Sequence, residues 1–210
     1  HLYPQRVFYY FEQIAAIPHG SRNTKAISDY LVDFAKEHQL VWYQDESNNV
    51  VIVKEATPGY ESAEPIIIQG HMDMVCEKEK GVNIDFEKDG LKLYVDGDFL
   101  KAEGTTLGGD DGIAVAYALA LLESSEIAHP KLEVVITVDE EIGMLGADAI
   151  DLSMLTGHTM LNIDSDVEGS FLTGCAGGMA VNVTLPVKRV TQHGQKLSLM
   201  VTGLEGGHSG

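Results

Sequence analysis

Apolar side chains recur along the first forty residues with the spacing of helices. Two faces with a period of three to four residues stand out: Phe8, Phe11, Ile14 and Ala15 in one segment, and Ile27, Leu31 and Phe34 in the next. Pro4 precedes the first face, and proline is tolerated in the first turn of a helix because no N–H is needed there. The pattern therefore predicts two amphipathic helices, the second beginning after Ser21.

The period then changes to that of extended chain. Short β-branched or aromatic runs bounded by Asn, Pro or Gly predict strands at 41–43, 50–53, 66–68, 134–138 and 160–163. Residues 91–95 and 99–102 predict a hairpin around Asp96-Gly97, since Asp-Gly is a favoured two-residue turn. The runs 134–138 and 160–163 are typical of a central sheet covered on both faces.

A helix is also predicted at Ile113–Leu122, where apolar residues lie almost all round and indicate burial. Strands that alternate with helices give an α/β fold class. After Gly174–Gly178 the pattern changes to two half-exposed strands, Ala180–Leu185 and Leu197–Val201. We place a domain boundary near Gly177, with one domain at 1–177 and the start of a second at 178–210.

Composition narrows the class of function. The chain has 210 residues, and its 32 acidic and 14 basic side chains give a formal charge of −18, which argues against binding to a phosphate backbone. No apolar run approaches the ~20 residues of a membrane span. The first residues do not resemble a signal peptide. Two cysteines, Cys76 and Cys175, are too few for a disulfide framework and fit a reducing cytoplasm, where we expect the protein to be.

Ionisable residues follow three predicted strands directly. His71 and Asp73 follow the run 66–68, Glu140 and Glu141 follow 134–138, and Asp164 follows 160–163. Ligands of open α/β sheets bind at the carboxyl edge of the strands. Asp110-Asp111 opens the predicted buried helix, where backbone N–H groups favour carboxylates.

Each of these residues also has a simpler interpretation. Taken alone, His71 would be a hydrogen-bonded imidazole, and Asp110-Asp111 would cap a helix. Glu140-Glu141 would be the solvated end of a strand, and Asp164 would cap a turn. Together, so many anionic groups at one edge would repel each other unless a cation lay among them. Imidazole and carboxylate ligands without cysteine pairs suit Zn²⁺, Mn²⁺ or Co²⁺. Calcium-loop, phosphate-loop and nucleophile-elbow motifs are not matched.

Five motifs occur in an order that resembles a known family: GHMDMV, GTTLGGDDGIA, TVDEEIGMLGA, NIDSDVEG and GGHSG. They resemble the aminoacyl-histidine (Xaa-His) dipeptidase branch of the zinc metallopeptidases that include aminoacylase, peptidase T and glutamate carboxypeptidase. The resemblance runs from Ile17–Ser21 to Gly210. It implies a three-layer zinc-exopeptidase-like catalytic domain with a mostly parallel central sheet, followed by the first strands of a truncated lid domain. It also implies that this chain is an N-terminal fragment.

The resemblance assigns the metal ligands residue by residue. It implies two divalent ions, most simply zinc, one held by His71 and Asp164 and the other by Glu141, with Asp110 bridging them. A further histidine ligand of the second ion lies near the C-terminus of family members and is absent here. We therefore expect the second site to be incomplete and the chain alone to have little peptidase activity.

Three catalytic roles follow from the same resemblance. Glu140 would be the general base that takes a proton from the attacking water, Asp73 would orient His71, and His208 would polarise the scissile carbonyl. The implied reaction is hydrolysis of unblocked dipeptides by a protein that forms a homodimer. The alternatives are a related amide hydrolase, such as an aminoacylase or a tripeptidase, and a non-catalytic relative that binds metal or peptide.

Four other residues could enter the site. His129 and His193 are expected in surface connections, whereas His19, in the Ile-Pro-His-Gly-Ser segment, is the histidine most suited to lie near the metal ligands. Cys76 is expected to be a small packing residue rather than a reactive thiol.

Overall fold

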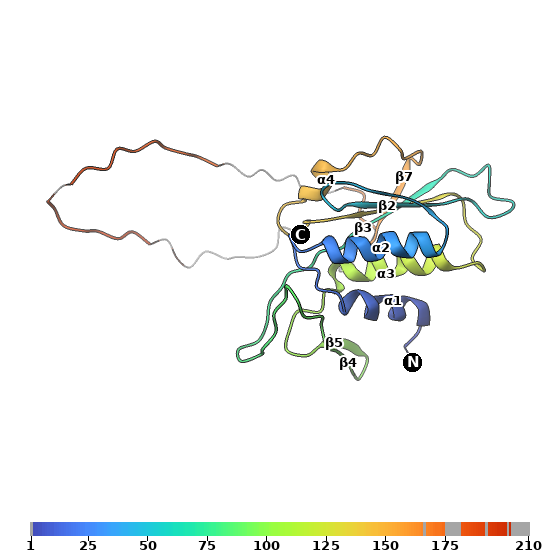
Figure 1. Cartoon of the computed structure of the whole chain (residues 1–210), viewed down its shortest axis with the longest axis horizontal. Coiled ribbons are helices and arrows are strands. Elements are labelled where there is room, and N and C mark those ends of the chain that lie inside the picture. Colours follow the sequence, from blue (N-terminus) through green and yellow to red (C-terminus); the bar gives the residue numbers. More distant parts are fainter. Residues whose placement is uncertain (1, 166, 175–181, 192, 201, 203–210) are drawn as a thin grey trace. The chain divides into compact units, whose positions relative to one another are not determined.

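The computed structural model describes residues 2–165, 167–174, 182–191, 193–200 and 202. Chain contacts divide the molecule into two units, residues 1–166 and 167–210. Gly177, where we expected a domain boundary, lies outside the described residues, so the two predicted domains remain a prediction. All helices and strands of the described residues belong to the first unit (Figure 1).

Helices form at the three places that the periodicity predicts. They are α1 (Gln5–Ala15), α2 (Lys25–Glu37) and α3 (Gly109–Glu123). Pro4 caps α1, and the apolar face of each of the first two helices is buried. A fourth helix, α4 (Leu145–Ala149), was not predicted, because five residues are too few to show a periodic pattern. None of the helices in the described part of the chain has the length and apolar character of a membrane span.

Within the described residues, five strands form the central sheet in the order β1-β2-β6-β3-β7. Their bounds are Val41–Gln44, Val50–Lys54, Leu132–Thr137, Ile66–His71 and Thr159–Asn162 in that order. Both pairings of β3 are parallel, and both pairings of β2 are antiparallel. Four of the five strands therefore share one direction and only β2 is reversed, so the α/β class with a mostly parallel sheet is confirmed. The expected hairpin also forms, from β4 (Leu93–Asp96) and β5 (Phe99–Ala102).

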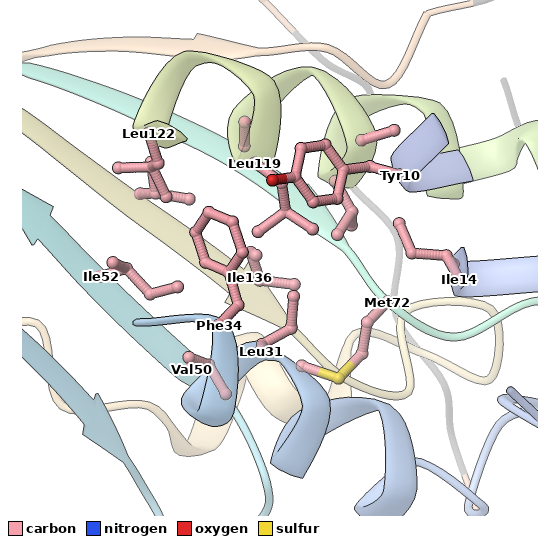
Figure 2. Close-up of a cluster of buried hydrophobic side chains, with 14 of the residues drawn as sticks. Tyr10, Ile14, Leu31, Phe34, Val50, Ile52, Met72, Leu119, Leu122 and Ile136 are labelled. Atoms are coloured by element: carbon pink, nitrogen blue, oxygen red, sulfur yellow. The ribbon is translucent and has the colours of Figure 1, made fainter. Parts of the chain in front are cut away.

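The main core lies between one face of the sheet and the three long helices. Figure 2 shows Leu31 and Phe34 of α2 meeting Ile136 of β6 and Leu119 of α3 inside this core. On the other face, Val51, Val53, Ile67 and Val135 pack under a thinner cover that includes Ile150 and Leu155. The sheet thus lies between two layers, with α4 and the segment that follows it on the second face (Figure 1).

Two predictions about strands were wrong. We expected residues 160–163 to be covered on both faces, but β7 lies at the edge of the sheet that the described residues form, and Met160 is 59% exposed. The described parts of the other two runs, 182–185 and 197–200, are not strands. A pair of strands has only marginal stability by itself. The alternation of apolar and polar residues cannot show whether a neighbouring sheet is present to stabilise such a pair.

Candidate metal centre

Three adjacent parallel strands bring the ionisable residues to one edge. His71 is the last residue of β3, which lies between β6 and β7. The register pairs His71 with Thr137 of β6, three residues before Glu140. It also pairs Gln69 with Asn162 of β7, which places Asp164 level with His71. The sequence-predicted cluster at the carboxyl edge of the sheet therefore forms.

Asp110 and Asp111 approach His71 from the first turn of α3. Asp110 Oδ1 lies 3.0 Å from His71 Nε2, and the backbone N–H of His71 donates to Asp111 Oδ2 over 3.2 Å. The residue in the cap position of α3 is Gly108, and no side chain caps the helix. The interpretation of the Asp pair as a helix cap is therefore wrong, because its backbone is not yet helical and its side chains face His71 instead.

Asp73 holds the imidazole of His71 from the opposite side. Its Oδ1 atom lies 3.3 Å from His71 Nδ1 and accepts the backbone N–H of Glu140 over 3.0 Å. Its Oδ2 atom accepts the hydroxyl of Ser21 over 2.8 Å. Burial by itself would raise the pKa of Asp73, but the hydrogen bonds from His71, Ser21 and Glu140 lower it below its ordinary value. The backbone carbonyl of Asp73 lies nearer still, 3.0 Å from His71 Nδ1. Asp73 is thus a buried residue whose carboxylate and carbonyl together fix the orientation of His71.

The loop after β6 is held in place by a buried asparagine. Asn49 Oδ1 accepts the N–H of Val138 over 3.0 Å, and Asn49 Nδ2 donates to the carbonyl of Gly146 over 3.0 Å. Between these two anchors, Glu140 Oε2 lies 3.9 Å from His71 Nε2. Glu140 and Glu141 therefore lie on a loop that is fixed by hydrogen bonds, and not at a freely solvated strand end.

The crowded carboxylates alter each other's acidity. Burial, with the charge of Asp164, raises the pKa of Asp111 to about 8. Burial also raises the pKa of Glu140 and of Glu141, with neighbouring carboxylates adding to the effect. For His71, burial acts to lower the pKa, but Asp73, Asp111 and Asp164 outweigh it and raise the pKa to about 10. The centre is therefore short of positive charge.

Two groups of side chains at this edge could hold a metal ion. One consists of His71, Asp110 and Glu141, and the other of His71, Asp111 and Asp164; within each group the ligand atoms lie within 4.8 Å of one another. One imidazole among several converging carboxylates is a donor set that suits a divalent cation. The residues present therefore fit the metal that the sequence predicts.

The other sequence candidates fall in different places. His19 is buried, its carbonyl accepts the N–H of Met74, and its imidazole feels the charge of Asp73, so it lies beside the centre. His129 lies in the connection before β6, as expected, although it is buried. His193 is exposed in the second unit. His208 lies outside the described residues.

Cys76 packs as expected of a small side chain. A Cβ atom placed on Gly20 would lie only 2.5 Å from Cys76 Sγ. Burial raises the pKa of the thiol, which disfavours its reactive thiolate form.

Sequence reasoning missed three residues that support the centre. Asp111 was grouped with Asp110 but was given no role of its own. Ser21 and Asp139 were given no role in the site, because a serine in a loop and an aspartate before two glutamates carry no spacing signal. Their contacts depend on segments that are brought together only by folding.

The chain is similar to known proteins in sequence and in structure. The profile of peptidase family M20/M25/M40 matches residues 67–184. The chain is 40% identical over its whole length to cytosol non-specific dipeptidase of Escherichia coli (strain K12) and covers 44% of that protein. The crystal structure of aminoacylhistidine dipeptidase from Vibrio alginolyticus is similar with a TM-score of 0.78 at 42% identity, over 80% of this chain and 34% of that one.

A tripeptidase from Staphylococcus aureus shares the fold, with a TM-score of 0.65 at 24% identity over 78% of this chain and 44% of that one. The chain thus spans less than half the length of each of these three relatives.

Proposed function

Because the chain belongs to peptidase family M20/M25/M40, we propose that it carries most of the metal centre of a metal-dependent dipeptidase. The substrates would be unblocked dipeptides, those of Xaa-His type among them. The names of two of these relatives, a non-specific dipeptidase and an aminoacylhistidine dipeptidase, support this choice over other amide hydrolases. The observation that carries the proposal is the convergence of His71, Asp110 and Glu140 at the carboxyl edge of the sheet.

Four side chains would hold two divalent ions, most simply zinc, with manganese or cobalt as alternatives. His71 and Asp164 would hold one ion, Glu141 would hold the other, and Asp110 would lie between them. When bound, such ions lower the pKa of water and polarise a carbonyl group. Asp73 would keep the imidazole of His71 turned so that Nε2 faces the carboxylates.

Glu140 would act as the general base. Its carboxylate is 30% exposed and lies beside His71 without being needed in either candidate group of ligands. It would take a proton from the water that attacks the peptide carbonyl and pass this proton to the leaving amine nitrogen. The division of labour between Glu140 and its neighbour Glu141 is supported by their surroundings, because only Glu141 belongs to a candidate group of ligands.

Three parts of the proposal extend beyond the described residues. His208 would donate to the oxyanion that forms on the substrate carbonyl. We place the protein in the cytoplasm, in line with the word cytosol in the name of the Escherichia coli relative. The complete protein would be a homodimer.

The test is hydrolysis by protein expressed from the complete reading frame that encodes this chain. We expect zinc-dependent cleavage of unblocked dipeptides such as Gly-His and Ala-Ala, and no cleavage of their N-acetylated forms. Preference for N-acylated substrates would instead identify an aminoacylase, and preference for tripeptides a tripeptidase. Tight metal binding without turnover of any of these would indicate a non-catalytic relative.

A further inference from the structure

A turn between α1 and α2 reaches the metal centre from a distant part of the chain. The N–H of Asn23 donates to the carbonyl of Gly20 over 2.8 Å and closes the turn. Gly20 forms a parallel bridge with Met74, whose N–H donates to the carbonyl of His19 over 3.2 Å. The turn is therefore fixed to the segment that follows β3 and carries Asp73.

Ser21 in this turn completes the hydrogen bonding of Asp73. The Ser21 hydroxyl donates to Oδ2 of Asp73 over 2.8 Å, while Oδ1 accepts the N–H of Glu140 and lies 3.3 Å from His71 Nδ1. The terminal torsion of an aspartate is broad, so one oxygen bonded alone leaves the carboxylate plane free to rotate. Ser21 therefore fixes the plane in which Asp73 meets both His71 and Glu140.

The next residue of the turn holds the chain just before Glu140. The backbone N–H of Arg22 donates to Oδ1 of Asp139 over 2.6 Å. Asp139 has a φ of +54°, in the left-handed region, which residues other than glycine adopt less readily. Such a conformation persists only where the surroundings hold it. The turn thus holds Asp139 directly, through the N–H of Arg22. It holds the amide of Glu140 indirectly, because Ser21 and Glu140 both bond to Asp73.

We propose that the Gly20–Arg22 turn positions Glu140 for catalysis, with Ser21 as the positioning residue that acts through Asp73. The inference rests on the proposed role of Glu140 as general base. A displacement of about 1 Å in a reacting group can cost about 10²-fold in rate. Because Ser21 acts through one intermediate side chain, its removal has a smaller effect, on the order of tenfold in kcat.

The first test compares three variants at Ser21 with a matched control, in zinc-loaded protein from the complete reading frame. Ser21→Ala removes the hydroxyl donor, and Ser21→Thr keeps it. Ser21→Cys keeps the volume of the side chain but donates only weakly. Ser21→Cys therefore replaces Ser21→Ala in the comparison if Ser21→Ala folds poorly. The control is Ser28→Ala, because Ser28, which is buried where Ser21 is half-buried, also donates its hydroxyl, here to the carbonyl of Asn48 over 2.7 Å.

We expect kcat to fall about tenfold in Ser21→Ala and Ser21→Cys with KM within about twofold, and Ser21→Thr to restore kcat to within about threefold. Ser28→Ala should leave kcat unchanged per folded molecule. Equal losses in Ser21→Ala and Ser28→Ala, or no loss in either, would overturn the proposal, because a purely structural serine affects only the amount of folded protein.

A second measurement does not depend on turnover. Amide hydrogen exchange of Glu140, followed by NMR, reports the bond from its N–H to Asp73. We expect Ser21→Ala to speed this exchange about tenfold and Ser28→Ala to leave it unchanged. Wild-type protein that hydrolyses no dipeptide would refute the proposed function, whereas unchanged exchange at Glu140 in Ser21→Ala would refute the positioning role by itself.

Discussion

At the scale of single residues, the adjacent carboxylates of Glu140 and Glu141 are distinguished by what surrounds them. Glu141 belongs to a group of possible metal ligands with His71 and Asp110, whereas Glu140 belongs to neither group. The backbone N–H of Glu140 is held by Asp73, and its side chain is 30% exposed. A base needs such access to water, because it must accept a proton from water and then release it to the leaving group.

This difference predicts opposite effects of the same substitution at the two positions. Glu140→Gln should lower turnover by about 10³-fold and leave the zinc content unchanged, because only the proton acceptor is lost. Glu141→Gln should lower the zinc content, because an amide is a poorer ligand than a carboxylate. Elemental analysis and dipeptide hydrolysis measure the two effects, with exposed Glu126→Gln as the control. Loss of zinc in Glu140→Gln would show that Glu140 is itself a ligand.

A different buried glutamate predicts how stability depends on pH. Glu133 is fully buried and accepts hydrogen bonds from Lys131, Thr156 and the N–H of Gly157. Burial by itself would raise the pKa of Glu133, but these bonds lower it from 4.5 to about 2. A lowered pKa in the folded state stabilises the protein above the unfolded value, and this contribution is lost as the pH falls from about 4.5 towards 2.

Glu133→Gln should therefore lower the free energy of unfolding by on the order of 2 kcal/mol at pH 7. The gap from wild type should shrink steadily as the pH falls through this window. Urea unfolding between pH 7 and pH 3 measures the gap, and Glu126→Gln should show none. A gap that stays constant with pH would mean that the charge of Glu133 contributes nothing.

At the scale of elements, the sequence was most informative where a local pattern decides the outcome. The run Ile66–Ile68 predicts a buried strand, and the residues that follow it must then lie at the edge of the sheet. The reversed direction of β2 and the exposure of β7 could not be predicted in this way, because both depend on which strands become neighbours. The supporting contact of Ser21 is beyond local pattern for the same reason, since its partner Asp73 lies 52 residues away.

The close approach of α3 to β3 gives a prediction about Gly70. A Cβ atom at this position would lie 2.6 Å from Asp111 Oδ2 and 2.9 Å from the Cβ of Ala114. Gly70→Ala should therefore force α3 away from the strand and lower the free energy of unfolding by about 1–3 kcal/mol. It should also weaken zinc binding, because Asp110 and Asp111 move with the start of α3.

Thermal unfolding and zinc titration measure these two effects. The control is Gly174→Ala, because nothing lies within 4 Å of a Cβ atom at that position. Zinc affinity that stays at the wild-type value in a destabilised Gly70→Ala protein would show that the contact between strand and helix supports the fold but not the metal centre.

At the scale of the whole molecule, the described ligands limit how many ions the chain can hold. The net charge is −18, and the carboxylates at the edge of the sheet repel one another unless a cation offsets them. Yet both candidate groups use His71, the only imidazole in either of them. Because Nδ1 of His71 is turned towards Asp73, only Nε2 is left to bind an ion, and the two groups compete for it.

We therefore expect the purified 210-residue chain to bind about one zinc ion, since one imidazole with two carboxylates gives a single site of three protein ligands. His71→Ala should remove this ion, because both groups lose their only nitrogen ligand. Glu141→Ala should keep it, because Asp111 and Asp164 still surround His71.

Elemental analysis after dialysis measures the zinc content of the wild-type chain, His71→Ala and Glu141→Ala. Glu126→Ala is the control for the loss of one exposed carboxylate. Zinc that survives both substitutions would mean that the ligands are other residues, and zinc absent from the wild-type chain would mean that the described residues cannot complete a site by themselves.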